Sequence, residues 1–287
     1  MITERDIQIL LALFHYYLLS RAQIQRLLFR NDTDGRITRR RLQLLVDLHL
    51  INRTQMQVCR HAAGAPAPVY YLSRKGCEVL AEYLNSERYL LGCTETPLPH
   101  HILHWLSISD RHITVDESLG NQDEVQLLEW NNEWDIVNKD EAAPEKHYRL
   151  YTLIRQVPRL VCAPDAGFLL QRNDTRKVFY LEEDQNTSGV YQVANQKTPG
   201  YAAMVEKQLH RRHFPTTTVD SFDIVVVAPN ERRRDALRKA VSKKPGAELW
   251  RFVAAPELTA ETFLHGKIFY PCDGDPGSLL QPPEDEK

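Results

Sequence analysis

Residues 222–228, Phe-Asp-Ile-Val-Val-Val-Ala, form a nearly continuous apolar run that limits the possible folds more than any other feature of the chain. Such a run is typical of a strand buried in the centre of a sheet. Two strands are predicted before it, and Asn173-Asp174 between them fits a hairpin turn. The predicted order is a helix from residue 100, strands at 125–130, 160–170 and 177–184, a helix at 201–213, the apolar strand, a helix at 231–241 and a strand at 248–253. This order predicts an α/β domain within a chain that is α+β overall.

The first ninety residues follow a different pattern, in which three helices precede a hairpin and a fourth helix. Capping boxes begin the first two helices, at Thr3-Asp6 and at Ser20-Gln23. The third helix is predicted over 36–48, and Ser73 begins the fourth. The hairpin strands are expected at 51–58 and 69–72, around a tip at 60–68 that is rich in glycine and proline. This is the order of a winged helix-turn-helix.

Apolar and basic side chains separate to opposite sides of the third predicted helix. At 100° per residue, Ile37, Leu44 and Leu48 share a face that we expect to be buried, with Leu45 at its edge. The opposite face carries arginines and a glutamine, which contact phosphates and base edges in DNA complexes but also occur on plain solvated helices. The candidate DNA-binding residues, including one in the predicted wing, are Arg36, Arg39, Arg40, Arg41, Gln43 and Arg60.

Charge is distributed unevenly along the chain. Residues 1–92 hold 13 basic and 8 acidic side chains, a net charge of +5, whereas residues 93–287 hold 23 basic and 30 acidic ones, a net charge of −7. A basic half next to an acidic half favours double-stranded DNA as the partner of the first half. The alternative use of a winged helix is a protein–protein contact.

Residues 92–99 contain two prolines and no apolar period, so we expect a linker there. The predicted domains are a DNA-binding domain at 1–91 and a second domain at 100–272, followed by a disordered, acidic and proline-rich tail at 273–287. The helix after the linker carries His100, His101 and His104. His-x-x-x-His spacing can bind a metal, but polar contacts or capping are the simpler interpretation of each histidine.

Several features favour a cytoplasmic protein that does not cross a membrane. The longest nearly apolar run, 9–19, is shorter than the ~20 residues of a membrane span. Charged residues precede this run and no small-residue cleavage site follows it, so no signal peptide is predicted. The five cysteines are widely and irregularly spaced, as in a reducing compartment.

Carboxylates gather on the predicted hairpin of the second domain. Alternation along a strand directs Glu182 and Asp184 to the same face, and Asp165 lies on the neighbouring strand. An aspartate in an otherwise apolar strand needs a partner, which weakens the interpretation that these acids are simply solvated. The three carboxylates Asp165, Glu182 and Asp184 therefore form a candidate site for one divalent metal such as Mg²⁺.

The same segment resembles the replication-relaxation family of mobile elements. The motifs that carry the resemblance are Pro164-Asp165-x-x-Phe168, Glu182-x-Asp184-x-x-Thr187 and Lys197-x-x-x-Tyr201, together with His104-x-Leu106-x-Ile108 and Trp130. With the predicted winged helix, the resemblance covers most of residues 3–255. It implies a second domain of the PD-(D/E)xK restriction-endonuclease fold. It also implies a role in plasmid or integrative-element DNA processing, which includes relaxases that nick an origin of transfer.

One departure from the fold's catalytic pattern leaves two interpretations open. Active nucleases of this fold end the strand motif in lysine, whereas this chain has Asp184 there. Lys197 from the next helix would then replace that lysine, and a candidate endonuclease or nickase would use Asp165, Glu182, Asp184 and Lys197 with Mg²⁺ or Mn²⁺. Alternatively the site is degenerate, and the protein is a DNA-binding regulator or a relaxosome accessory protein. Either version would bind other mobilisation or replication proteins or form a homodimer.

Overall fold

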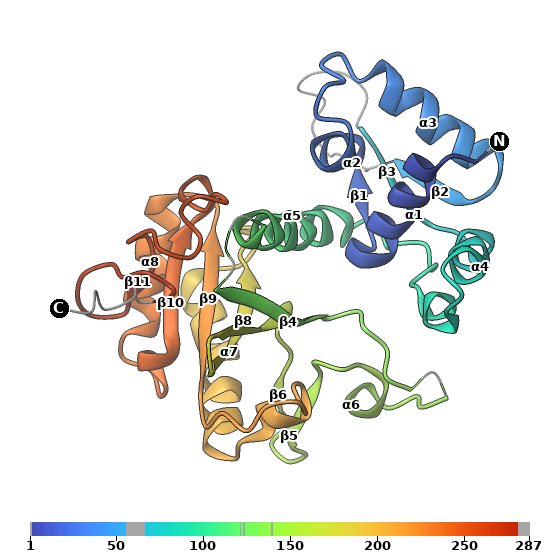
Figure 1. Cartoon of the computed structure of the whole chain (residues 1–287). Helices are drawn as coiled ribbons and strands as arrows, with labels where there is room; N and C mark the ends of the chain where they lie inside the picture. Colours follow the sequence, from blue (N-terminus) through green and yellow to red (C-terminus); the bar gives the residue numbers. More distant parts are fainter. Residues whose placement is uncertain (1, 56–66, 121, 123, 139, 281–287) are drawn as a thin grey trace. The chain divides into compact units, whose positions relative to one another are not determined.

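Helices and strands make up most of the computed structural model, which describes residues 2–55, 67–120, 122, 124–138 and 140–280. The chain is α+β overall, as predicted, and divides into two units, Met1–Ile113 and Thr114–Lys287 (Figure 1). The division falls inside helix α5 (Ile102–Leu119), downstream of the linker that the sequence suggests at 92–99.

The first unit contains the predicted order of three helices, a hairpin and a further helix. Its three strands are antiparallel, in the order β1-β3-β2. The elements are α1 (Glu4–Tyr16), β1 (Leu19–Ser20), α2 (Arg21–Leu28), α3 (Arg36–Asp47), β2 (Ile51–Gln55), β3 (Pro68–Leu72), α4 (Arg74–Tyr83), a 3₁₀ turn η1 (Glu87–Leu91) and the first part of α5. Most of the predicted wing tip, including Arg60, lies outside the described residues.

The predicted caps begin three of these helices. The backbone N–H of Thr3 donates to Asp6 at 2.7 Å, and the backbone N–H of Ser20 donates to Gln23 at 2.9 Å. The Ser73 hydroxyl accepts from the N–H of Gly76 at 3.0 Å at the start of α4. These bonds satisfy helix N–H groups that would otherwise lack partners.

Helix α3 buries a different face from the one predicted. Ile37 is 48% exposed, and the buried residues are Thr38, Leu42 and Leu45, so Leu45 from the edge of the expected face is buried while Ile37 is not. The reason lies in the preceding turn, where Asp32 accepts hydrogen bonds from the N–H and hydroxyl of Thr38 at 2.7 and 2.6 Å. These bonds hold the Thr38 side chain toward the core. The buried face of α3 is therefore centred near Thr38 rather than near Ile37.

Arg41 pairs with a buried carboxylate of the first unit and so contributes to the fold, while its predicted contact with DNA stays a prediction. Its Nε donates to Asp6 Oδ1 at 2.8 Å, and its Nη2 forms a second bond to the same carboxylate. The Asp6 side chain is fully buried and that of Arg41 is 21% exposed. Burial alone would raise the pKa of Asp6, but hydrogen bonds from Arg41 and Thr3 outweigh it and hold the pKa below its usual value.

The second unit is built on a six-stranded mixed sheet in the order β11-β10-β9-β8-β7-β4. Strands β8, β9 and β10 are parallel to one another, and the remaining pairs are antiparallel. Its main elements are β4 (Val125–Asn132), α6 (Pro144–His147), β5 (Thr152–Arg155), β6 (Leu160–Cys162), β7 (Ala166–Arg172), β8 (Thr175–Glu183), α7 (Val190–Glu206), β9 (Phe222–Ala228), α8 (Glu231–Val241), β10 (Trp250–Ala254) and β11 (Tyr270–Pro271), with 3₁₀ turns η2 (Leu209–Arg212), η3 (Ala247–Leu249) and η4 (Ala255–Glu257).

Three predicted elements differ from the structure. The strand expected at 160–170 is two strands, because the chain leaves β6 at Ala163-Pro164-Asp165 before it enters the large sheet as β7. Helix α7 begins eleven residues earlier than the expected 201 and contains Pro199. Residues 273–280 still pack on the unit, since Gly277 pairs with Phe269 and Leu279 is buried, and the rest of the expected disordered tail lies outside the described residues.

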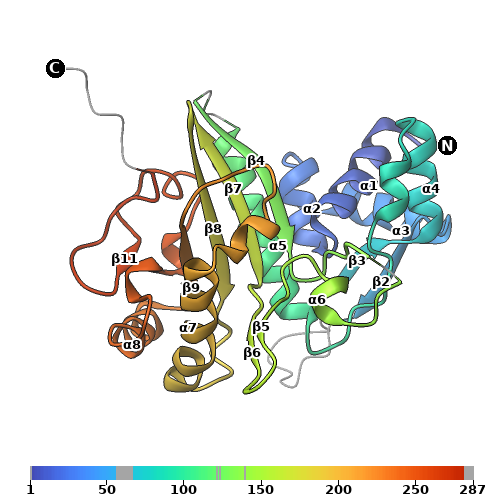
Figure 2. The same cartoon turned by 90° about the horizontal axis from the view of Figure 1, so that it is seen from below.

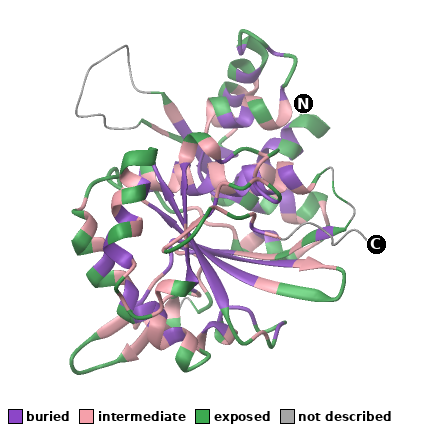
Figure 3. Cartoon of the chain, turned by 90° about the vertical axis from the view of Figure 1, so that its left-hand side faces the viewer, coloured by how far each residue is buried: buried purple, intermediate pink, exposed green. Residues whose placement is uncertain are grey.

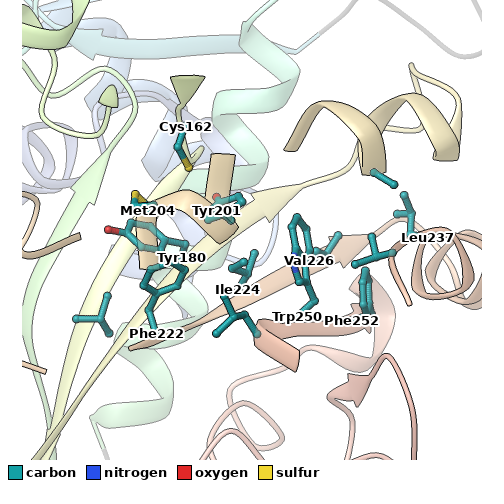
Figure 4. Packing of buried hydrophobic residues seen from close by; sticks show 14 of the residues in the cluster. Cys162, Tyr180, Tyr201, Met204, Phe222, Ile224, Val226, Leu237, Trp250 and Phe252 are labelled. Atoms are coloured by element: carbon teal, nitrogen blue, oxygen red, sulfur yellow. The ribbon is translucent and has the colours of Figure 1, made fainter. Parts of the chain in front are cut away.

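A large apolar cluster lies between the sheet and helices α7 and α8. Figure 3 shows the strands of the large sheet as mostly buried. Figure 4 shows Tyr201 and Met204 of α7 beside Tyr180 of β8, with Leu237 of α8 near Phe252 of β10. This cluster fixes α7 against β8, and these are the two elements that carry the candidate site.

None of the helices in the described part of the chain combines the length and hydropathy that a membrane span requires.

The Asp6–Arg41 pair yields a stability prediction. Asp6→Asn should lower the free energy of unfolding by about 3 kcal/mol near neutral pH, because it leaves the Arg41 guanidinium without its counter-charge. Since the folded pKa of Asp6 is depressed, its contribution is present above the unfolded pKa and is lost as the pH falls through the folded value. Urea unfolding of wild type and variant at several pH values measures both effects.

Asp34→Asn is the matched control for this variant. Asp34 pairs with Arg36 on the surface, where the two side chains are 56% and 83% exposed. Such pairs contribute about 0–1 kcal/mol. Equal losses in the two variants would show that Asp6 and Arg41 have no special role in the fold.

Candidate functional site

A lysine ammonium lies between two buried carboxylates, where the neighbouring inner strands β7 and β8 begin and end. Lys197 Nζ is 2.7 Å from Glu182 Oε2 and 3.6 Å from Asp165 Oδ1. The same ammonium donates to the carbonyl of Ala163 at 3.2 Å. Asp165 and Glu182 are 8% and 7% exposed, whereas the Lys197 side chain is 33% exposed. The structure therefore brings together three of the four predicted catalytic residues, with the lysine at the solvent side.

The strand ends explain why the two carboxylates meet. Asp165 comes directly before β7 and Glu182 is near the end of β8, and these strands pair antiparallel, with Ala166 opposite Leu181. The backbone N–H of Glu183 donates to Asp165 Oδ2 at 2.8 Å. This bond holds the Asp165 side chain at the end of the β7–β8 pairing. Glu182 faces α7, because alternation along β8 directs Tyr180 and Glu182 to the side that this helix covers.

Tyr201 holds the second oxygen of Glu182. Its hydroxyl donates to Glu182 Oε1 at 2.5 Å, and the tyrosine is fully buried. Lys197 and Tyr201 are four residues apart in α7, so they project from the same face of the helix. Tyr201 is absent from the candidate residues named above, although the spacing Lys-x-x-x-Tyr gives the signal that would have included it.

The electrostatics of this site reflect a shortage of positive charge. Burial and the nearby charge of Asp165 raise the pKa of Glu182, and Lys197 and Tyr201 partly oppose this rise. Burial disfavours the charged form of Lys197, but the carboxylates of Glu182 and Asp165 outweigh it and raise the pKa of the lysine. Lys197 therefore stays protonated near neutral pH, and its single ammonium contacts two carboxylates that repel each other.

Asp184, the fourth predicted catalytic residue, pairs with Arg233 rather than with Lys197, and its role as a metal ligand stays a prediction. Strand β8 ends at Glu183, so the alternation of side chains along the strand no longer determines the direction of the Asp184 side chain. Arg233 of α8 binds both oxygens of Asp184, at 2.7 and 2.9 Å, and also donates to the carbonyl of Ser188 at 2.7 Å. The bidentate ion pair raises the pKa of Arg233 and ties the loop between β8 and α7 to α8.

Arg233 is a residue that the sequence reasoning missed. It lies within a run of three arginines, Arg232 to Arg234, and no spacing in the sequence distinguishes it from its neighbours. Its function follows from its contacts, because the loop that it holds separates Glu182 from Lys197 in the chain.

The donor set fits a hard divalent cation bound by Asp165 and Glu182. Both ligands are carboxylates, both are buried, and the ionised group has an excess of negative charge that a cation would remove. A metal at these oxygens would compete with the Lys197 ammonium. Because Lys197 is partly exposed, its flexible side chain can move toward solvent and remain beside the metal.

The first unit carries the second group of candidate residues. On α3, Arg36, Arg39, Arg40 and Gln43 are all exposed. Arg53 of β2, which sequence reasoning also missed, is exposed and donates to Gln43 Oε1 at 3.2 Å. Its outward position follows from the alternation of the strand. We call these five residues the arginine face.

Replacing Lys197 with methionine should destabilise the fold in a pH-dependent way. Glu182 has a raised folded pKa, so stability is greatest below its unfolded pKa and falls as the pH rises through the folded value. Without the ammonium, the pKa of Glu182 rises further and the fall becomes larger. We expect Lys197→Met to lose about 2–3 kcal/mol near pH 8 and less near pH 5, measured by urea unfolding.

Lys177→Met serves as the control, since Lys177 lies at the other end of β8 and pairs with Asp223 at 2.6 Å while its side chain is 42% exposed. This variant should lose about 1 kcal/mol or less. A loss for Lys197→Met that is the same near pH 5 and pH 8 would contradict the charge balance described for Glu182.

Comparison with known proteins agrees with the geometry of the two units. No curated protein and no solved structure matches the chain. The family model described as replication-relaxation matches residues 11–219, which include both the arginine face and the site around Lys197. The match confirms the resemblance on which the sequence analysis relied, and it indicates a role in DNA replication or processing. The chain belongs to the replication-relaxation family.

Proposed function

We propose that this protein is a DNA-processing factor of a plasmid or integrative element, which binds duplex DNA through its first unit and cuts one strand through its second. The first unit would be a winged helix that presents the arginine face to DNA. The second would be a domain of the PD-(D/E)xK type. One observation carries the catalytic part, namely that Lys197 Nζ lies 2.7 Å from Glu182 and 3.6 Å from Asp165.

This geometry supports the proposal even though the strand motif lacks its lysine. Helix α7 delivers a lysine to the same two carboxylates that the motif would otherwise serve from β8. A bound Mg²⁺ or Mn²⁺ would polarise the scissile phosphate and lower the pKa of an attacking water. Asp165 and Glu182 would hold the metal, and Tyr201 would orient Glu182. Lys197 would stabilise the negative charge that develops on the phosphate during cleavage.

A second candidate function is a regulator or relaxosome accessory protein that does not cleave DNA. The observation in its favour is that Lys197 and Tyr201 already satisfy the two oxygens of Glu182 without a metal. In this version the second unit would bind other mobilisation or replication proteins.

The arginine face predicts a specific loss of DNA affinity. Arg39→Ala combined with Arg40→Ala should weaken binding and reduce the slope of log K against log salt by about 0.9 for each lost phosphate contact. Arg74→Ala combined with Lys75→Ala removes the same charge from exposed positions of α4 and should leave the slope unchanged. Equal slopes for both double variants would reject α3 as the recognition helix.

Metal binding and cleavage separate the two candidate functions. Mn²⁺ should raise the melting temperature of the wild type, by an amount that corresponds to about 2.7 kcal/mol at a hundredfold excess over Kd. It should also support nicking of supercoiled plasmid that carries the element's own origin. Asp165→Ala should abolish both effects, while Asp220→Ala at an exposed position should retain them.

The variant Lys197→Met distinguishes most directly between the cleaving and the non-catalytic function. It should bind Mn²⁺ more tightly than the wild type, because the competing ammonium is gone, but it should not nick DNA. A wild type that shows neither a Mn²⁺-dependent thermal shift nor nicking would leave the non-catalytic function as the conclusion.

A further inference from the structure

The β5–β6 hairpin is a basic element in an otherwise acidic part of the chain. Residues 146–164 contain Lys146, Arg149, Arg155 and Arg159 and no acidic residue, although residues 93–287 together carry a net charge of −7. The two strands pair only with each other and lie outside the six-stranded sheet (Figure 2). The hairpin is therefore an insertion between β4 and β7, and the large sheet does not need it for pairing.

The base of the hairpin is fixed firmly to the candidate site. Gly200 of α7 approaches β6 so closely that an added Cβ would lie 2.7 Å from the carbonyl oxygen of Val161. One helical turn away, Lys197 bonds the carbonyl of Ala163, which follows β6 directly. The chain then continues through Pro164 to Asp165.

The other strand of the hairpin is held by a buried histidine. His213 Nε2 is 2.8 Å from the hydroxyl of Thr152 in β5, and Nδ1 is 2.6 Å from the hydroxyl of Tyr180 in β8. Burial lowers the pKa of His213 to about 3, so the ring stays neutral and these bonds persist near neutral pH. Both strands of the hairpin are thus held by contacts where they meet the rest of the second unit.

The tip of the hairpin combines free positive charge with an exposed apolar side chain. Residues 155–159 are all exposed, and Val157, at 85%, is the most exposed large apolar residue in the described part of the chain. Arg155 donates to the carbonyl of Pro158 at 3.1 Å, and Arg159 donates to the hydroxyl of Tyr151 at 2.9 Å. Both guanidinium groups bond neutral oxygen atoms, and the acidic group whose charge acts on Arg159 is Glu145, which precedes the hairpin in the chain.

We propose that this hairpin is a second DNA-contacting arm, which lies along the duplex beside the cleavage site with its tip in the minor groove. Arg155 and Arg159 would contact phosphates on either side, and Val157 with Pro158 would press against the base steps. Apolar wedges of this kind unstack bases and bend the duplex, while arginines supply the affinity. A bend at this place would present the scissile phosphate to Lys197.

This inference rests on the proposal that the second unit acts on DNA, and charge considerations support that partner. The acidic background of the second unit repels phosphates, so a DNA substrate requires a local basic element next to the site. An acid-free hairpin anchored on Asp165 and Lys197 supplies that element.

The test uses the full chain with short mixed-sequence duplexes that contain 2-aminopurine, whose fluorescence rises when bases unstack. Arg155→Ala combined with Arg159→Ala should reduce the slope of log K against log salt by nearly two, at about 0.9 for each phosphate contact. Val157→Ser should keep the slope and lose the fluorescence rise. The controls are Arg232→Ala with Lys239→Ala on α8, both exposed, and Tyr191→Ser on α7, which is 65% exposed. Neither control should change either measurement.

The outcomes separate this inference from the proposed function. If the hairpin variants bind and unstack DNA as the wild type does, while Arg39→Ala with Arg40→Ala weakens binding, the arm is refuted and the DNA-binding function stands. If the wild type does not bind duplex DNA at all, both proposals fail. All substituted positions are exposed, and an unchanged melting temperature confirms that each variant is folded.

Discussion

The second unit depends on how two buried carboxylates are balanced by one lysine. Asp165 and Glu182 are brought together by the antiparallel pairing of β7 with β8, and both are buried there. Lys197 offsets the repulsion between the two carboxylates, because its ammonium contacts both of them. Since Lys197 comes from α7, the helix must be seated accurately on the sheet. Three features hold α7 in this position. They are the aromatic cluster around Tyr180 and Tyr201, the close contact at Gly200 and the Asp184–Arg233 ion pair.

This balance also separates folding from metal binding. In small zinc domains the ligands repel one another until the metal arrives, and the protein is unfolded without it. Here a lysine of the chain itself serves as the counter-ion. A metal would add to a site that is already assembled, and it would displace the lysine from between the carboxylates toward the place where a phosphate would lie.

The sequence predicts elements well where one local signal dominates. Strand β9 and helix α8 occur at the predicted residues, and an unbroken apolar run marks the strand clearly. Helix α7 begins before the expected residue 201 and continues through Pro199-Gly200, a pair that would ordinarily interrupt a helix. Tertiary packing prevails there, because Gly200 is needed for the contact with β6.

The candidate site was predictable in part for similar reasons. Asp165, Glu182 and Lys197 follow from motif positions, and the structure brings them together. Arg41 and Asp184 have ion-pair partners that the sequence analysis did not anticipate, and those partners are distant in sequence. Asp6 is 35 residues from Arg41, and Arg233 is 49 residues from Asp184. Helical and strand periodicity describe which way a side chain points, but they do not identify a distant ion-pair partner.

The separation of the β5–β6 hairpin from the large sheet has an evolutionary consequence. Because its strands pair only with each other, residues at its tip can change in length, charge or shape without disturbing the strands that carry the carboxylates. Relatives with the same carboxylates and lysine would then be free to diverge in this loop. Such a division lets the charged residues be inherited unchanged while the loop varies in sequence.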